Sequence, residues 1–245
     1  MFYNFNIIGF KPIGRHKNVA RRVLKDEGMK NILVLIDGFN FYHKLKTYQS
    51  MNNVCVKWLN YKELIKSYFK DYDDYNFEYY YFSAYADFRG DDVVERHKTY
   101  VKALKSENIK VILGKFKEKF GKKCRVCNTP ITKEDLKRHE EKNTDVNIAI
   151  TLIEKAIKKE YDKCFILSAD SDFNSAITRA KELYPEGIIT IVPPPIPNNN
   201  NRKGKYNISA LQKLTATNPL FVSWEKIKQN QFPDNFNGLK NPFKV

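Results

Sequence analysis

The chain has 245 residues, enough for one large domain or for one domain with attachments, and 42% of them are hydrophobic and 14% aromatic. This composition excludes an intrinsically disordered chain, and because no apolar run approaches the roughly 18 residues that span a bilayer, it also excludes a membrane-spanning protein. Lys and Arg number 43 against 28 Asp and Glu, and the net charge of +15 favours a polyanionic partner such as nucleic acid, although a lysine-rich composition can also serve solubility alone.

The cysteines indicate a reducing compartment. Four of them, Cys55, Cys124, Cys127 and Cys164, are too few and too unevenly spaced for a disulfide framework, and the apolar start of the chain precedes its positive charges, unlike a signal peptide. We therefore expect a cytoplasmic protein.

Residues 1–30 are predicted to be a basic N-terminal appendage. They carry seven Lys or Arg residues against Asp26 and Glu27 and show no helix or strand period. Met29 directly precedes the first strong strand, so the folded domain begins there. A basic arm that contacts nucleic acid is the alternative for this segment.

From residue 31 the sequence alternates apolar runs rich in β-branched and aromatic residues with longer amphipathic segments. The pattern is typical of βαβ units and predicts an α/β fold with a mainly parallel, Rossmann-like sheet flanked by helices over 31–195. The expected strands are Asn31–Ile36, Phe77–Tyr85, Lys110–Leu113, Lys163–Ser168 and Ile188–Val192. The expected helices are Asn40–Tyr48, Tyr61–Phe69, Asp92–Glu107, Thr144–Lys159 and Ser171–Leu183.

The helix expected over Thr144–Lys159 has the clearest apolar stripe. That stripe comprises Ala149, Leu152, Ile153, Ala156 and Ile157.

Two segments interrupt or follow this alternation. Residues 115–142 form a lysine-rich insert that contains two cysteines, and Pro193–Lys205 is too rich in Pro and Asn for regular structure. We expect 196–245 to be a loop followed by a C-terminal segment that wraps the domain.

Asp37 is the first candidate for the functional site. It follows the first strand in the run Ile36-Asp-Gly-Phe-Asn40, and ligands of open parallel sheets bind beyond the carboxyl ends of the strands. Asp-Gly is also a hairpin signal, but the residues that follow fit a helix better than a second strand.

A second acidic segment, Ser168-Ala-Asp-Ser-Asp-Phe173, lies where another apolar strand gives way to a helix. Helix capping explains one of its two acids, Asp170 and Asp172, but two carboxylates this close repel each other unless a cation compensates them.

Asp145 opens the long amphipathic helix. Compensation of the helix dipole explains it without any function, but in a doubly wound sheet it can join the other three aspartates at one rim. Such a set of carboxylates suits Mg²⁺ or Mn²⁺ better than Zn²⁺, and in a basic protein it indicates phosphodiester cleavage.

The three segments together resemble the signature of the NYN domains, which are PIN-like ribonucleases, and within them the bacterial LabA-like branch. The matching segments are Asp37-Gly-Phe-Asn40, Thr144-Asp-Val-Asn-Ile-Ala149 and Ser168-Ala-Asp-Ser-Asp-Phe173, in the order of the family, with Ala169 where the family commonly has Gly. The resemblance implies a metal-dependent endoribonuclease with a catalytic site of Asp37, Asp145, Asp170 and Asp172. It also implies that Asn40 and Ser168 are polar supports.

In this scheme Asp37, Asp145 and Asp170 hold the principal Mg²⁺ or Mn²⁺, and Asp172 assists it or orients the water. His43, just beyond the first aspartate, is a candidate general acid or phosphate contact, although a surface histidine without a role is equally compatible with the sequence. Tyr42 beside it is placed to touch substrate, whereas Tyr79–Phe82 and Tyr85 are expected to pack in a strand.

The insert predicts a second metal site. Cys124 and Cys127 form half of a zinc ribbon, and with His139 they are candidate ligands of a structural Zn²⁺ in a zinc-ribbon-like loop. The fourth ligand stays open among His97, Glu140 and Glu141, and an unused or redox-active cysteine pair is the alternative. A zinc site would fix the basic residues of the loop, such as Lys115, Lys117 and Arg125, as an RNA grip.

Other classes fit the sequence less well. A haloacid-dehalogenase-type phosphatase needs an Asp at position 39, where this chain has Phe, and no P-loop or dinucleotide-binding glycine pattern occurs. The sequence therefore predicts a metal-dependent endoribonuclease that acts on single-stranded RNA. The alternative is a non-catalytic RNA-binding or regulatory protein that retains the PIN-like fold.

Overall fold

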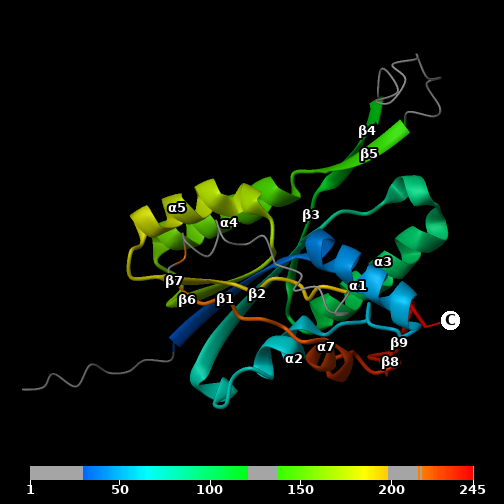
Figure 1. Cartoon of the computed structure of the whole chain (residues 1–245), viewed down its shortest axis with the longest axis horizontal. Coiled ribbons are helices and arrows are strands. Elements are labelled where there is room, and N and C mark those ends of the chain that lie inside the picture. The colour runs from blue at the N-terminus through cyan, green and yellow to red at the C-terminus, as the bar shows by residue number, and fades with distance from the viewer. Residues whose placement is uncertain (1–29, 121–136, 198–214, 216, 245) are drawn as a thin grey trace, which may run out of the picture.

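The computed structural model describes residues 30–120, 137–197, 215 and 217–244 (Figure 1). At its centre is a five-stranded sheet in the order β3-β2-β1-β6-β7, in which every pair of neighbours is parallel. The strands are β1 (Lys30–Asp37), β2 (Tyr75–Ser83), β3 (Lys110–Leu113), β6 (Lys163–Leu167) and β7 (Ile188–Ile191). The strand order reverses between β1 and β6, and in sheets of this kind ligands bind at the carboxyl ends beside that point.

Helices cover both faces of the sheet, and Figure 1 shows the resulting three layers. The helix α4 (Thr144–Lys158) and the helix α5 (Asn174–Leu183) pack on one face. The other face carries α1 (Gly38–Asn52), α2 (Tyr61–Lys66), α3 (Asp91–Ser106) and α7 (Trp224–Gln229). Short 3₁₀ turns lie at Tyr72–Asp74, Asp87–Arg89 and Ser171–Phe173.

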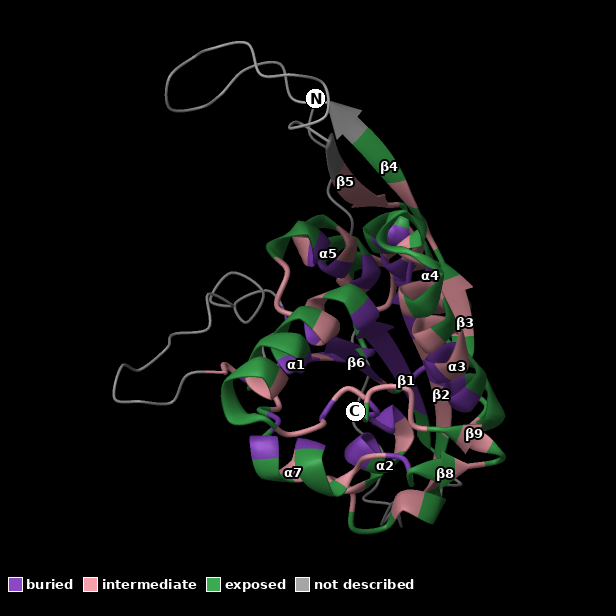
Figure 2. Cartoon of the chain, turned by 90° about the vertical axis from the view of Figure 1, so that its right-hand side faces the viewer, coloured by how far each residue is buried: buried purple, intermediate pink, exposed green. Residues whose placement is uncertain are grey.

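The central strand β1 shows why this sequence forms the sheet. Its residues from Ile32 to Asp37 are all buried, as expected for a parallel strand with helices on both faces (Figure 2). Ile32, Val34 and Ile36 enter the core beneath α1, whereas Leu33 and Leu35 enter the core beneath α4 and α5. The α/β class and the mainly parallel sheet expected from the sequence are therefore confirmed, with all five strands and all five helices in place.

The buried line of α4 differs from the expected stripe. Ile148, Leu152 and Ala156 are buried, but Ile157 is 62% exposed and Ala149 and Ile153 are only half-buried. The buried residues follow an i, i+4 line that begins at Thr144, because the start of the helix is held close to the end of β3. There a Cβ on Gly114 would lie 2.5 Å from the carbonyl oxygen of Lys142 and 2.8 Å from Thr144 Oγ1, so only glycine allows this approach.

The two ends of the insert are strands, not loops, and they pair with each other in an antiparallel arrangement. The strands β4 (Lys115–Phe120) and β5 (Lys137–Lys142) project beyond the sheet (Figure 1), and Phe116 is paired with Glu141. Residues 121–136, which include Cys124 and Cys127, lie outside the described residues, and the described part shows no zinc-ribbon fold.

The C-terminal segment packs on the α1 and α2 side. Trp224 of α7 stacks on Tyr48 with ring centroids 3.7 Å apart, and the Phe232 amide donates to the Trp58 carbonyl at 2.8 Å. A short hairpin, β8 (Asn235–Phe236) and β9 (Leu239–Lys240), follows. None of the helices in the described ranges has the length and apolar character needed to cross a membrane.

Candidate functional site

Asp37 lies at the carboxyl end of β1 and caps the helix α1. Its Oδ1 accepts from the Asn40 amide at 2.9 Å, and its Oδ2 accepts from the Ser168 hydroxyl at 2.8 Å. The residue is only 4% exposed, and these two hydrogen bonds fix its buried side chain in place. The capping bond satisfies one free amide of the first helical turn, which is why the chain turns from strand to helix at this residue.

The segment after β6 is tied to Asp37 across the switch point of the sheet. The Ser168 hydroxyl also accepts from the Asp170 amide at 3.1 Å, and Asp170 Oδ1 accepts from the Asp172 amide at 3.0 Å. The Ala169 amide lies 3.4 Å from Asn40 Oδ1. Asn40 and Ser168 thus connect the two strand ends, and the cap at Asp170 turns its short 3₁₀ helix away from the strand.

Asp145 approaches from the first turn of α4, close enough for its charge to interact with those of Asp37 and Asp170. Burial raises the pKa of Asp37 to about 6, and the charges of Asp145 and Asp170 add to the rise, against the bonds from Asn40 and Ser168. Partial removal from water, followed by repulsion from Asp170 and Asp172, likewise raises the pKa of Asp145. The structure brings together all four aspartates that the sequence singled out.

Glu141 is a fifth carboxylate of the same site. It stands on β5, three residues before the helix, and its Oε1 accepts from the Thr144 hydroxyl at 2.5 Å. Burial raises the pKa of Glu141 to about 7, with further repulsion from Asp37 and Asp145. From the sequence, Glu141 was expected only as one of three candidates for a fourth zinc ligand, because its place in this site depends on the pairing of β4 with β5. We call Asp37, Glu141, Asp145, Asp170 and Asp172 the acidic cluster.

The donors of the acidic cluster fit a hard divalent cation, because all are carboxylate oxygens whose repulsion no ion pair relieves in the described part of the chain. Their present side-chain positions do not form a finished site. In the ranges that the structure describes, no three His, Cys, Asp or Glu side chains are arranged to hold one metal ion. A bound cation would therefore require side-chain rotation that brings carboxylates of the acidic cluster closer to one another.

The zinc ligands expected in the insert are only in part described. Cys124 and Cys127 lie outside the described residues. His139 is on β5, where its ring stacks on Phe88 at 3.6 Å between centroids and its Nε2 lies 3.6 Å from Glu118 Oε1. Of the three residues left open as a fourth ligand, His97 lies on α3 beside Ser83, Glu140 pairs with Lys142, and Glu141 belongs to the acidic cluster.

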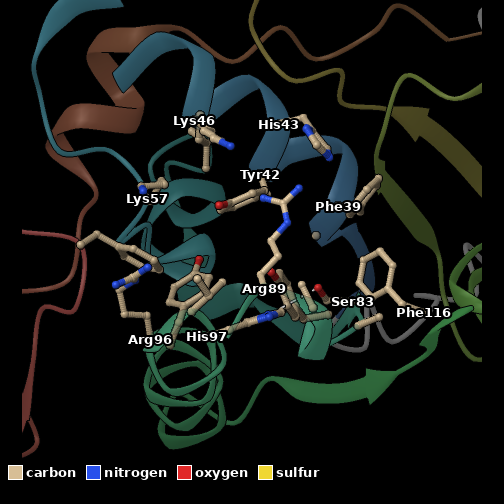
Figure 3. Close-up of a pocket in the computed structure, with 18 of the residues that line it drawn as sticks. Phe39, Tyr42, His43, Lys46, Lys57, Ser83, Arg89, Arg96, His97 and Phe116 are labelled. Carbon is tan, nitrogen blue, oxygen red and sulfur yellow. Dashed lines mark hydrogen bonds between the residues drawn. The ribbon is translucent and has the colours of Figure 1, made fainter. Parts of the chain in front are cut away.

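A cavity of about 520 Å³, whose lining Figure 3 shows, lies on the α1 and α3 side of the same sheet edge. It lies beside the acidic cluster, because its lining includes Gly38, which follows Asp37, and Tyr81, on which the charges of Asp37 and Glu141 act. Tyr42 and His43 of α1 line it, as do Arg89, His97 of α3, and Phe116 of β4. Partial burial and then the charges of Lys46, Arg89 and Lys44 lower the pKa of His43. His43 lines this cavity, and its role as a general acid or a phosphate contact stays a prediction.

Gly38 and Tyr81 form the boundary between the cavity and the acidic cluster. A Cβ on Gly38 would lie 2.4 Å from Tyr81 Cζ and 2.7 Å from the Phe82 carbonyl oxygen, so the helix can start here only with glycine. Burial raises the pKa of Tyr81, and repulsion from Glu141 and Asp37 adds to this rise. Tyr81 therefore adjoins both regions.

The fold and the site define a class: a three-layer α/β protein with a carboxylate cluster at the switch point of a parallel sheet. A family model, the NYN domain, matches residues 31–200, and the chain belongs to that family. The family consists in general of PIN-like, ribonuclease-type hydrolases.

Comparisons with solved structures and with curated proteins say less about the function. The chain is similar to a crystal structure of a protein of unknown function from Vibrio parahaemolyticus, with a TM-score of 0.50 and 14% identity over 82% of this chain and 98% of that chain. At this identity the likeness supports the fold alone. No curated protein matches the sequence.

Proposed function

We propose that the protein is a metal-dependent endoribonuclease that hydrolyses phosphodiester bonds of single-stranded RNA at the acidic cluster. The observation that carries the proposal is the convergence of five carboxylates from four separate segments, with no Lys or Arg paired to them in the described part of the chain. Burial and the charges of neighbouring acids raise the pKa of three of them, Asp37, Glu141 and Asp145. In a protein of net charge +15, such a concentration of negative charge fits a site for a divalent cation.

Asp37, Asp145 and Asp170 would hold Mg²⁺ or Mn²⁺, and Glu141 is near enough to join them. When bound, the ion would polarise the scissile phosphate and lower the pKa of a water molecule. The residues of the chain supply the positions: Ser168 and Asn40 fix Asp37 between the two strand ends, and Asp172 orients the water.

Cleavage of a fluorescently labelled single-stranded RNA by the purified protein tests this function. We expect cleavage only with Mn²⁺ or Mg²⁺, and none by the Asp170→Asn variant, in which the cap of the 3₁₀ turn is preserved because Asn also caps well. Asp73→Asn is the matched control, since Asp73 is exposed near the opposite end of β2. Equal cleavage by the wild type and Asp170→Asn would contradict the proposal.

A non-catalytic RNA-binding or regulatory protein is the second candidate. The observation that favours it is that no three carboxylates of the described residues are arranged to hold a metal ion. Salt-sensitive RNA binding without metal-dependent cleavage would establish this candidate.

Three finer predictions rest on the sequence: the LabA-like branch, the cytoplasmic location and the structural Zn²⁺ at Cys124, Cys127 and His139. Elemental analysis of the purified protein tests the zinc. About one equivalent per chain, lost in a Cys124→Ser, Cys127→Ser double variant, supports it, whereas a zinc-free wild type excludes it.

A further inference from the structure

The cavity beside the acidic cluster has a strongly uneven composition. Four of its lining side chains are basic, namely Lys46, Lys57, Arg89 and Arg96, and no Asp or Glu of the described chain lines it. Arg96 is paired with Asp92 at 2.8 Å, but within the described ranges no carboxylate pairs with the other three. Burial lowers the pKa of Lys57, and the charges of Arg96 and Lys46 lower it further. The cavity therefore favours an anion.

The other end of the cavity is aromatic. Five rings lie in a row here, in the order His43, Phe39, Phe116, Phe88 and His139. The ring centroids are 6.1 Å apart between Phe39 and Phe116, 5.1 Å between Phe116 and Phe88, and 3.6 Å between Phe88 and His139. Phe39 and Phe88 are each 37% exposed, so parts of their faces are free to stack with a ligand. Figure 3 shows Phe39 and Phe116 on one side of the cavity and Lys46, Lys57 and Arg96 on the other, with Arg89 between them.

The size of the cavity limits what fits. A volume of about 520 Å³ lies within the ~300–1,000 Å³ typical of small-molecule sites, so it suits one nucleotide rather than a duplex. A planar base can stack on the aromatic end while its phosphate lies among the cations.

The aromatic end also borders the acidic cluster. Phe116 is the cross-strand partner of Glu141, and such partners project from the same face of a strand pair. Phe39 follows Asp37 by two residues. A nucleotide with its base at Phe39 and Phe116 is therefore a direct neighbour of a phosphate positioned at the carboxylates.

We propose that this cavity binds one unstacked nucleotide of the RNA strand, next to the phosphate presented to the acidic cluster. The proposal rests on the proposed function and adds to it the form of the substrate, a strand with a base free to leave the stack. It places Phe39, Phe88 and Phe116 at the base and Lys46, Lys57 and Arg89 at the phosphate.

RNA binding in EDTA tests the cavity separately from catalysis. Fluorescence anisotropy with a labelled single-stranded RNA of about ten nucleotides reports the affinity. We expect the Lys46→Gln, Lys57→Gln double variant to bind about tenfold more weakly, with the slope of log K against log salt reduced by about 1.4 for two lost phosphate contacts. We expect Phe39→Ala and Phe88→Ala each to weaken binding about fivefold or more through a lost stack.

Matched variants control for charge and for folding. The Lys44→Gln, Lys102→Gln double variant removes the same charge from exposed positions of α1 and α3 outside the cavity, and Phe221→Ala removes a phenylalanine that is 53% exposed elsewhere. Both should bind within about twofold of the wild type, apart from a small nonspecific charge effect. Equal losses in the cavity variants and in these controls would overturn the proposal.

Two competitors distinguish the source of the nucleotide. A duplex of the same sequence should bind at least about tenfold more weakly than the single strand, because its bases are stacked and paired, and AMP should compete only weakly, since it makes one set of contacts. Tight AMP binding together with weak RNA binding would overturn the strand proposal in favour of a free-nucleotide site. If the wild type binds RNA through the cavity but does not cleave it with Mn²⁺, the proposed catalysis fails while the cavity proposal stands.

Discussion

The acidic cluster and the cavity share one strand end and have opposite charges. The cluster gathers five carboxylates on the α4 side of the sheet edge, whereas the cavity gathers Lys46, Lys57, Arg89 and Arg96 on the α1 and α3 side. Gly38 and Tyr81 line the cavity next to the cluster, since Gly38 follows Asp37 in the chain and the charges of Glu141 and Asp37 act on Tyr81. The contrast indicates that the two regions have different roles. The carboxylates require a cation that can act on a phosphate, and the cavity offers positive charge and aromatic surface that can bind the RNA strand.

Substitution within the cluster should produce the largest effect on activity. In Asp37→Asn the Oδ1 atom can still accept from the Asn40 amide, and the Ser168 hydroxyl can accept from the new amide group, so the fold is retained. Cleavage should fall at least about a hundredfold, since a metal supplies several kcal/mol of charge stabilisation. RNA binding in EDTA should change little. A variant that cleaves normally would remove Asp37 from the site.

Gly38→Ala tests the boundary between the two regions. The new methyl group would clash with the Tyr81 ring and the Phe82 carbonyl, and we expect a loss of about 3 kcal/mol in the free energy of unfolding, measured by urea denaturation. Gly238→Ala is the comparison, because nothing lies within 4 Å of its Cβ and only its positive φ of 77° opposes alanine, at about 1 kcal/mol. Equal losses at the two glycines would show that the start of α1 can shift.

The pH dependence of stability should report the burial of the carboxylates and, after it, the repulsion within the cluster. The pKa values of Asp37 and Glu141, about 6 and about 7 in the fold, lie above the unfolded values of 3.8 and 4.5. The stability that these groups contribute is therefore full below about pH 4 and is lost as the pH rises through about 6–7. Metal-free Asp37→Asn should gain about 2 kcal/mol on the wild type between pH 4 and 8.

Thermal melts of both proteins across that range measure the difference. Mn²⁺ should restore the wild type at pH 8 more than it restores the variant. Parallel pH profiles for the two proteins would show that neither burial nor repulsion raises the pKa of Asp37.

The smallest expected effect is that of the cavity histidines on RNA affinity. Burial lowers the pKa of His97 to about 4 and also lowers the pKa of His43, which weakens the contribution of both side chains to the positive charge of the cavity. RNA affinity in EDTA should change by less than about twofold between pH 6.5 and 8, and His43→Gln should have an equally small effect. A steep rise in affinity as the pH falls through 6.5 would show that a histidine carries the charge.

The sequence predicted the parts of this molecule that depend on local pattern. Asp37, Asp170 and Asp172 each follow an apolar strand, and Asp145 opens an amphipathic helix, so their residue types and positions were sufficient to place them at one edge. The alternation of strands and helices likewise predicted the parallel sheet. These features need only short stretches of chain.

The features that sequence reasoning missed depend on contacts between distant segments. Glu141 joins the cluster only because β4 and β5 pair and hold it beside Thr144, and the cavity takes its lining from α1, the segment after β2, α3 and the hairpin. The apolar stripe expected on α4 wrongly included Ile157, which is exposed. Several faces of this helix are apolar, and the close packing at Gly114 determines which of them is buried.

Binding of Mn²⁺ to the purified protein, followed by electron paramagnetic resonance, tests most directly whether the acidic cluster is a cation site. We expect saturable binding by the wild type, weakened at least about tenfold in Asp37→Asn and in Glu141→Gln and unchanged in Asp73→Asn. Equal Mn²⁺ affinity in all four proteins, or no binding by the wild type, would contradict a shared cation at these carboxylates.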